Sequence, residues 1–231
     1  MLPIADTIRS RSFPLVNWIL IAVNALAFFY ETSLSPDQLL SFITTYALIP
    51  AQIDLAQPLS LVPFLTHQFL HADWLHFLSN MWILFIFGDN VEDRLGPIRY
   101  LIFYLLGGVA AGALQVYLAT DPTLPALGAS GAIAAVLGGY FVFFPTARVI
   151  TLIPIFLFPW FVRVPALIYL GLWFLLQFLQ GVTSLVPGAP ATNIAWWAHI
   201  GGFLFGLVLA RPLCARRCAP RRYWADEYYP W

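Results

Sequence analysis

The chain has 231 residues, of which 61% are hydrophobic and 10% charged, with a formal net charge of zero and a mean hydropathy of +0.80. Soluble domains have about 45–50% apolar and about 25% charged residues, so the composition excludes that class and indicates a polytopic membrane protein. The chain contains no lysine and no basic block, which excludes nucleic acid as a partner. Its two cysteines, Cys214 and Cys218, lie near the end of the chain and exclude a disulfide scaffold.

Six hydrophobic stretches approach the roughly 20 residues that a helix needs to cross a bilayer. In chain order they are Pro14–Tyr30, Leu70–Gly88, Ile98–Ala119, Ser130–Pro145, Val164–Gln180 and Ile194–Pro212. A seventh stretch, Val149–Val162, is too short to cross at about 1.5 Å per residue and is interrupted by Pro154 and Pro159. We interpret it as an interfacial loop. The sequence therefore predicts an all-α membrane protein with six transmembrane helices, the fourth of them short.

The arginines predict the orientation, because basic residues accumulate at the cytoplasmic ends of spans. With six spans and a cytoplasmic N-terminus, all 11 basic residues fall in the inner segments and none in the outer loops. A span at 149–162 would destroy this asymmetry. We therefore expect both termini in the cytoplasm, with a tail at 1–13, a six-helix membrane domain at 14–213 and a second tail at 214–231.

Polar side chains within or beside the spans are candidates for function, because an unsatisfied polar group in lipid costs free energy. All four histidines are of this kind: His67, His71, His76 and His199. Asn80 follows His76 by four residues, so a helix places both side chains on one face. Either these groups act on a common object, or they form interhelical hydrogen bonds worth roughly 1 kcal/mol each.

The fourth span opens with Gly128-Ala129-Ser130-Gly131 and is too short to reach both membrane surfaces. Ser130 is therefore expected below the outer surface, at a helix N-terminus whose free N–H groups can stabilise an anion. The alternative interpretation is that the small residues of this span, Gly131, Ala134 and Gly138, form only a packing surface.

The two interpretations are compatible if the fourth and sixth spans face each other. His199 shares a helix face with Gly206 and is followed by Gly202, and small residues let two helices approach closely. Such an approach would allow the Ser130 hydroxyl to meet the His199 imidazole. A serine and a histidine in contact are a nucleophile and its general base.

Together these motifs resemble the rhomboid intramembrane serine proteases over about residues 14–213. The resemblance is carried, in chain order, by His76-x-x-x-Asn80, Glu92-x-Arg94-x-Gly96, Gly128-Ala129-Ser130-Gly131 and Ala198-His199-Ile200-Gly201-Gly202. It implies that Ser130 is the nucleophile and that His199 is the general base and acid. It also implies that Asn80, His76 and the Ser130 backbone N–H hold the oxyanion.

The family resemblance implies a serine endopeptidase that cleaves transmembrane segments through an acyl-enzyme intermediate, without a metal or other cofactor. The implied partners are transmembrane protein substrates and the lipid bilayer, and the implied location is a prokaryotic plasma (inner) membrane in the six-span arrangement. We expect Gly128, Trp173 and Phe174 to contact substrate, with the fifth span and the loop Gly181–Asn193 acting as a gate. The oligomeric state is not indicated.

Two positions depart from the family pattern. Ala134 stands where many relatives carry an aromatic residue that stacks on the catalytic histidine, so the ring must be positioned by other groups. The first outer loop, from Glu31 to about His67, lacks the Trp-Arg pair of many members.

Two other functions remain open from the residues alone. The four histidines could hold a Zn²⁺ ion in a membrane hydrolase, although the chain has no His-Glu-x-x-His motif and offers no carboxylate in the fourth, fifth or sixth span as a base. A non-catalytic transporter or chaperone of membrane helices is the other alternative.

Overall fold

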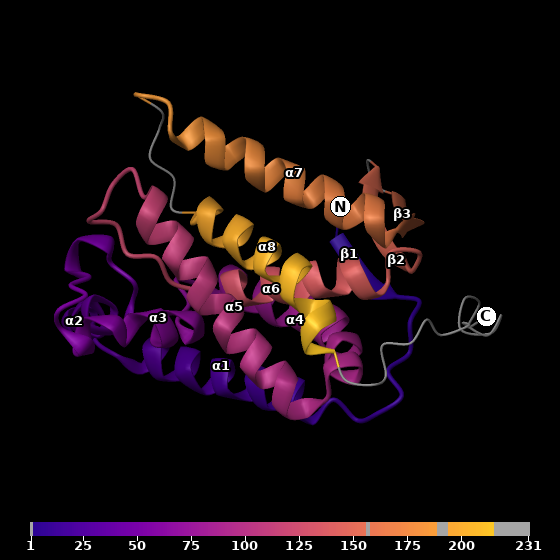
Figure 1. Cartoon of the computed structure of the whole chain (residues 1–231), viewed down its shortest axis with the longest axis horizontal. Coiled ribbons are helices and arrows are strands. Elements are labelled where there is room, and N and C mark those ends of the chain that lie inside the picture. Colours follow the sequence, from indigo (N-terminus) through magenta and orange to yellow (C-terminus); the bar gives the residue numbers. More distant parts are fainter. Residues whose placement is uncertain (1, 156–157, 189–193, 215–231) are drawn as a thin grey trace.

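The computed structural model describes residues 2–155, 158–188 and 194–214, which form a helical body with a small sheet at one end (Figure 1). Six long helices correspond to the six predicted stretches, with ends that differ by a few residues. They are α1 (Leu15–Ser33), α4 (Trp74–Leu95), α5 (Pro97–Leu118), α6 (Ser130–Phe143), α7 (Ala166–Ser184) and α8 (Trp196–Leu213). Among the described residues, α1, α5 and α7 are long and apolar enough to cross a membrane, and α6 is a shorter apolar helix.

The largest shift from the prediction concerns α4, which extends seven residues beyond Gly88. The Asp73 side chain accepts a hydrogen bond from the His76 N–H and caps the helix start, and Gly96, with φ of 80°, ends it. The charged last turns stay buried because Glu92 accepts hydrogen bonds from the backbone N–H groups of Val16 and Asn17, at 3.0 and 2.7 Å. These are free donors at the start of α1, so one carboxylate joins two helices.

The expectation of an all-α protein is wrong, because the segment expected as an interfacial loop at 149–162 contributes to two β-strands. Strands β1 (Leu2–Asp6), β2 (Arg148–Ile155) and β3 (Phe158–Pro165) form an antiparallel sheet in the order β1-β2-β3. Pro154 and Pro159 pair with each other one step from the end of the hairpin. Proline is tolerated at strand ends and on edge strands, so these residues do not break the sheet.

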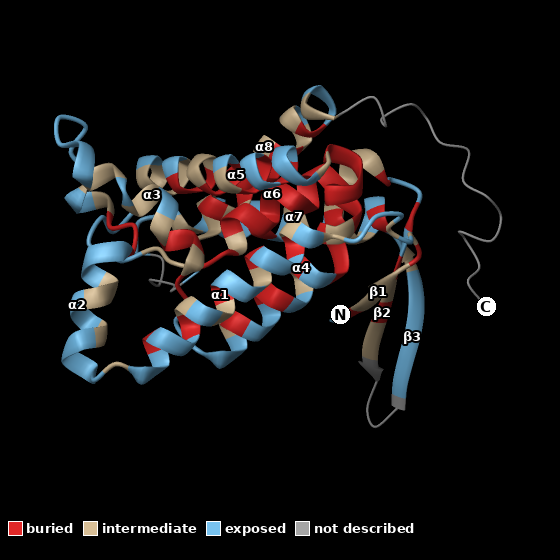
Figure 2. Ribbon diagram, turned by 90° about the horizontal axis from the view of Figure 1, so that it is seen from below, coloured by how far each residue is buried: buried red, intermediate tan, exposed pale blue. Residues whose placement is uncertain are grey.

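The segment predicted as an N-terminal tail therefore contributes a strand, and it is fixed to the helices through Asp6. The Asp6 carboxylate accepts hydrogen bonds from the Tyr140 hydroxyl on α6 and from Asn90 Nδ2 on α4, the latter at 2.9 Å. Burial raises the pKa of this carboxyl well above its ordinary value, against the effect of the Tyr140 hydrogen bond. Figure 2 shows the sheet at one end of the helices with β3 exposed.

The segment between α1 and α4 contains short helices and lies at the other end of the molecule (Figure 1). It holds α2 (Pro36–Tyr46), α3 (Pro63–Thr66) and the 3-10 turns η1 (Pro50–Gln52), η2 (Pro58–Leu61) and η3 (His67–Phe69). The start of α2 is fixed by a capping box between Ser35 and Gln38. This end of the molecule carries the start of α6 and the candidate site.

Helix α6 is the centre of the bundle, and every residue from Gly131 to Tyr140 is buried (Figure 2). Its small residues bring its backbone directly against the backbone of α8. A Cβ atom on Gly202 would lie 2.0 Å from the Gly131 carbonyl oxygen, and one on Gly206 would lie 2.1 Å from the Ala135 carbonyl oxygen. The predicted small-residue contact between the fourth and sixth spans is thus confirmed.

This contact predicts that Gly206→Ala destabilises the fold, because the added methyl group meets a backbone carbonyl that cannot move aside. Overpacking of this kind costs about 1–3 kcal/mol. Thermal unfolding of the purified protein in detergent measures the effect. The control is Gly171→Ala on α7, where the nearest atom to an added Cβ is 3.8 Å away. Equal melting temperatures for the two variants would contradict the close α6–α8 packing.

Candidate active site

Ser130 and His199 meet at the contact between α6 and α8. Ser130 is the first residue of α6, and its Oγ lies 2.8 Å from Nε2 of His199 on α8. A neutral imidazole with the proton on Nδ1 can accept the serine proton at Nε2. Both side chains are only partly buried. The structure thus brings together the two residues predicted from the sequence as nucleophile and base, while their catalytic roles remain predictions.

The position of the pair follows from the small residues around it. A Cβ atom on Gly131 would lie 2.6 Å from the Ala111 side chain of α5, and one on Gly202 would lie 3.2 Å from the Ala134 side chain. Three helices therefore converge immediately behind Ser130. A larger residue at position 202 would push α8, and with it His199, away from the serine, whereas one at position 131 would collide with α5.

The other ring nitrogen of His199 is held by a residue that the sequence analysis did not single out. Gln177 of α7 places its Oε1 atom 2.7 Å from His199 Nδ1. The rings of Trp173 and Trp196 lie 6.0 and 6.3 Å from the imidazole, tilted and edge-on respectively. These groups surround the histidine at a site where Ala134 offers no aromatic ring. The available signal was the polar side chain of Gln177 inside a largely apolar span.

His76 borders the same site through the glycine that precedes α6. A Cβ atom on Gly128 would lie 2.7 Å from His76 Nε2 and 3.7 Å from Ser130 Oγ. Gly128 also has φ of 129°, which L side chains rarely adopt. Its N–H donates to the His67 carbonyl oxygen at 2.9 Å, which fixes the loop that leads into Ser130. The glycine is therefore required both by its backbone conformation and by the space that His76 occupies.

Asn80 lies one turn beyond His76 on α4, a helix that packs against α6. Its side chain is 7% exposed, and its Nδ2 atom has no hydrogen-bond partner within the described structure. A buried amide donor without an acceptor costs free energy, and an oxygen atom placed beside Nδ2 would remove that cost. It is a donor that an incoming oxygen can use.

The histidines do not assemble into a metal site. His67 Nδ1 lies 2.7 Å from the Pro63 carbonyl oxygen, and the His71 ring packs edge-on against His76 at 5.2 Å. Within the described ranges, no three His, Cys, Asp or Glu side chains are grouped so that they could hold a metal ion. The grouping that the zinc alternative requires is therefore missing from this part of the chain.

The expected substrate-contacting residues on α7 differ in their surroundings. Trp173 borders His199, whereas Phe174 stacks on Phe203 of α8 with ring centroids 4.7 Å apart. Phe174 is thus part of the α7–α8 packing. Of the expected gate loop Gly181–Asn193, residues 189–193 lie outside the described residues.

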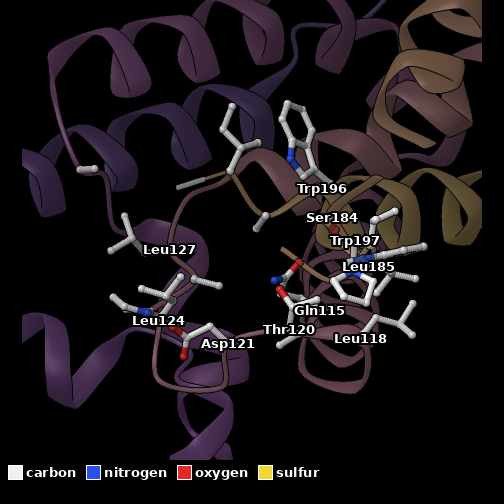
Figure 3. A pocket seen from close by; sticks show the side chains of 18 of the residues that line it. Gln115, Leu118, Thr120, Asp121, Leu124, Leu127, Ser184, Leu185, Trp196 and Trp197 are labelled. Carbon is white, nitrogen blue, oxygen red and sulfur yellow. The ribbon is translucent and has the colours of Figure 1, made fainter. Parts of the chain in front are cut away.

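A cavity of about 550 Å³ opens at this end of the molecule (Figure 3). Its lining includes His76 and Gln115, the polar loop residues Thr120 and Asp121, and Trp196 at the start of α8. Hydrogen bonds from the Thr123 hydroxyl and N–H lower the pKa of Asp121, which keeps the rim charged. His76 and Asp121 therefore border the same cavity.

Comparison with known proteins identifies the family. The model of the rhomboid domain matches residues 58–216, which is more than half of the chain. The chain therefore belongs to the rhomboid family. It is a multi-pass membrane protein.

Similar curated proteins are organellar. "Presenilin-associated rhomboid-like protein A, mitochondrial" of Danio rerio is 32% identical over 149 residues, 63% of this chain and 36% of the relative. "Rhomboid protein 1, mitochondrial" of Saccharomyces cerevisiae is 29% identical over 146 residues, 61% of this chain and 38% of the relative. "Rhomboid-like protein 11, chloroplastic" of Arabidopsis thaliana is 39% identical over 70 residues, 30% of this chain and 25% of the relative. The matched segment thus spans well under half the length of these relatives.

Proposed function

We propose that this chain is an intramembrane serine endopeptidase that cleaves transmembrane segments of other proteins with Ser130 as nucleophile and His199 as general base. The observation that carries the proposal is the 2.8 Å contact between Ser130 Oγ and His199 Nε2 at the start of a buried helix. Membership of the rhomboid family supports it.

In the first half of the reaction, Ser130 Oγ attacks the scissile carbonyl carbon while its proton passes to His199 Nε2. The carbonyl oxygen becomes an oxyanion at the N-terminus of α6, where the Ser130 N–H points away from the helix. We assign Asn80 Nδ2 and the His76 ring as further donors to this oxygen. Collapse of the tetrahedral intermediate breaks the C–N bond, and His199 gives its proton to the leaving amine.

In the second half, water hydrolyses the acyl-enzyme. His199 takes a proton from the water, whose oxygen attacks the ester carbon, and the departing Ser130 oxygen recovers that proton. The cavity lined by His76, Gln115 and Asp121 is the route by which we propose that water reaches this depth.

The substrate must approach from the lipid and unwind locally, because a helical peptide bond is blocked by its own hydrogen bonds and side chains. We propose that α7 is the gate. Its outward side chains are exposed to the surroundings, whereas only Ala166, Leu170, Gln177 and Gly181 are buried. We also assign Gly128, in the loop before Ser130, and Trp173 and Phe174 of α7 to contact with the substrate.

We also propose six spans with both termini in the cytoplasm, on the basis of the arginine distribution. The relatives named above are mitochondrial or chloroplastic, and they give no support to the prokaryotic plasma membrane that the sequence resemblance implied.

The dyad predicts that Ser130→Ala and His199→Ala each abolish cleavage of a transmembrane substrate in proteoliposomes while membrane insertion is unchanged. The double variant should be no worse than either single variant, because the two residues act as one unit. Effects that multiply would count against a dyad.

Chelator treatment should leave cleavage unchanged, whereas a loss that Zn²⁺ restores would favour the zinc hydrolase. A transporter or chaperone would show no cleavage in any variant.

The oxyanion assignment predicts unequal effects for its two side-chain donors. Loss of one such donor costs about 10²–10³ in turnover, so Asn80→Ala should lower kcat by that factor. His76→Ala should cost less, because the Asn80 amide and the Ser130 N–H still hold the oxygen. Both rates come from the same cleavage assay. A wild-type rate for Asn80→Ala would remove the oxyanion role.

The orientation is tested by accessibility of single cysteines in a Cys214→Ser, Cys218→Ser background. A cysteine at position 184, at the end of α7, should react with an impermeant thiol reagent added outside. A cysteine at position 146, between α6 and β2, should react only after the membrane is opened. The reverse pattern would overturn the six-span orientation.

A further inference from the structure

We infer that Gln177 is a positioning residue for His199, so that a third side chain orients the base of the Ser130–His199 dyad. The inference rests on the proposed function and adds a member to it. The inference is carried by two contacts, one at each ring nitrogen of His199. Gln177 Oε1 is 2.7 Å from His199 Nδ1, and His199 Nε2 is 2.8 Å from Ser130 Oγ.

The chemistry of an amide oxygen explains what Gln177 does. Oε1 only accepts hydrogen bonds, so its partner Nδ1 must carry the proton. The tautomer with a proton on Nδ1 leaves the lone pair on Nε2, which is the atom that faces the serine hydroxyl. The opposite tautomer would donate from Nε2 to Ser130 and could not act as a base. Gln177 therefore selects the tautomer that can remove the serine proton.

The same hydrogen bond also stabilises the charged ring. When His199 takes the serine proton, it becomes an imidazolium with donors on both nitrogens. The hydrogen bond from Nδ1 to Gln177 Oε1 strengthens as positive charge develops on the ring. Because Oε1 is already aligned with Nδ1, the side chain needs no rearrangement at that moment. The benefit therefore falls on the chemical step and not on substrate binding.

The burial of Gln177 argues that its side chain has a specific partner. It is 9% exposed and is the only polar side chain among the four residues that α7 buries. A glutamine amide placed in an apolar interior without a partner would destabilise the helix packing. Gln180 on the same helix is exposed, so its side chain does not require a partner inside the helix packing.

The origin of the acceptor on α7 has a consequence for gating. Ser130 is on α6 and His199 is on α8, and these helices are locked together by backbone contacts. Gln177 belongs instead to the more exposed α7. The base is therefore oriented only while α7 remains packed at the level of His199.

The test compares variants of the full-length protein in the rate at which a fluorophosphonate labels them. Gln177→Met removes the acceptor with little change in volume, and Gln177→Glu keeps an acceptor at the same place. Gln180→Met is the matched control on the exposed face. We expect Gln177→Met to label about tenfold more slowly than wild type with the same final labelled fraction. We expect Gln177→Glu and Gln180→Met to label within about threefold of wild type.

Cleavage kinetics separate positioning from a merely structural role. Gln177→Met should lower kcat by a similar factor and leave KM unchanged, because Gln177 touches His199 and not the substrate. A wild-type labelling rate for Gln177→Met would overturn the inference and leave the proposed function standing. A lower melting temperature and a reduced labelled fraction in both Gln177 variants would show that the residue only holds the helices together. Absence of labelling in wild type would overturn the proposed function and this inference with it.

Discussion

The direct backbone contact between α6 and α8 is the constraint on which the rest of the site depends. In lipid, helices gain little from burying apolar side chains, so close van der Waals packing has to hold them. Gly131 and Gly202 bring the two backbones together where a Cβ atom would collide with a carbonyl oxygen. That approach alone allows a hydroxyl as short as that of Ser130 to reach the ring of His199.

The surrounding elements fix the two helices by polar contacts between segments far apart in the sequence. Glu92 accepts hydrogen bonds from the backbone N–H groups at the start of α1. Asp6 of β1 accepts hydrogen bonds from Tyr140 of α6 and Asn90 of α4. These anchors lie at the end of the bundle that carries the sheet. At the other end, Asn80 Nδ2 is a buried donor without a hydrogen-bond partner in the described structure, and His76, one turn before it on α4, lines a cavity. Hydrogen bonds fix the helices at one end, and the Asn80 donor at the other end is left for the oxygen of a reacting group.

The sequence predicted the helices well and the sheet not at all, for physical reasons. Apolar runs define spans directly, and the small residues at 131 and 202 predicted the close helix contact that the structure contains. The pairing of β1 with β2 is a contact between residues about 150 positions apart, and no local pattern reveals it. Pro154 suggested a broken loop because its place at the hairpin end depends on the pairing of β2 with β3. Gln177 was missed because the sequence does not distinguish it from Gln180 in the same span until the position of the His199 ring is known.

The account is tested most directly by locating the covalent adduct that a fluorophosphonate leaves on the purified protein. Peptide mass mapping should place the modification on Ser130, with stoichiometry approaching one per chain, and the Ser130→Ala variant should remain unmodified. That result would establish Ser130 as an activated serine, since ordinary serine hydroxyls do not react. An unmodified wild-type protein, or an adduct on a different residue, would contradict the claim that the α6–α8 contact builds a serine protease.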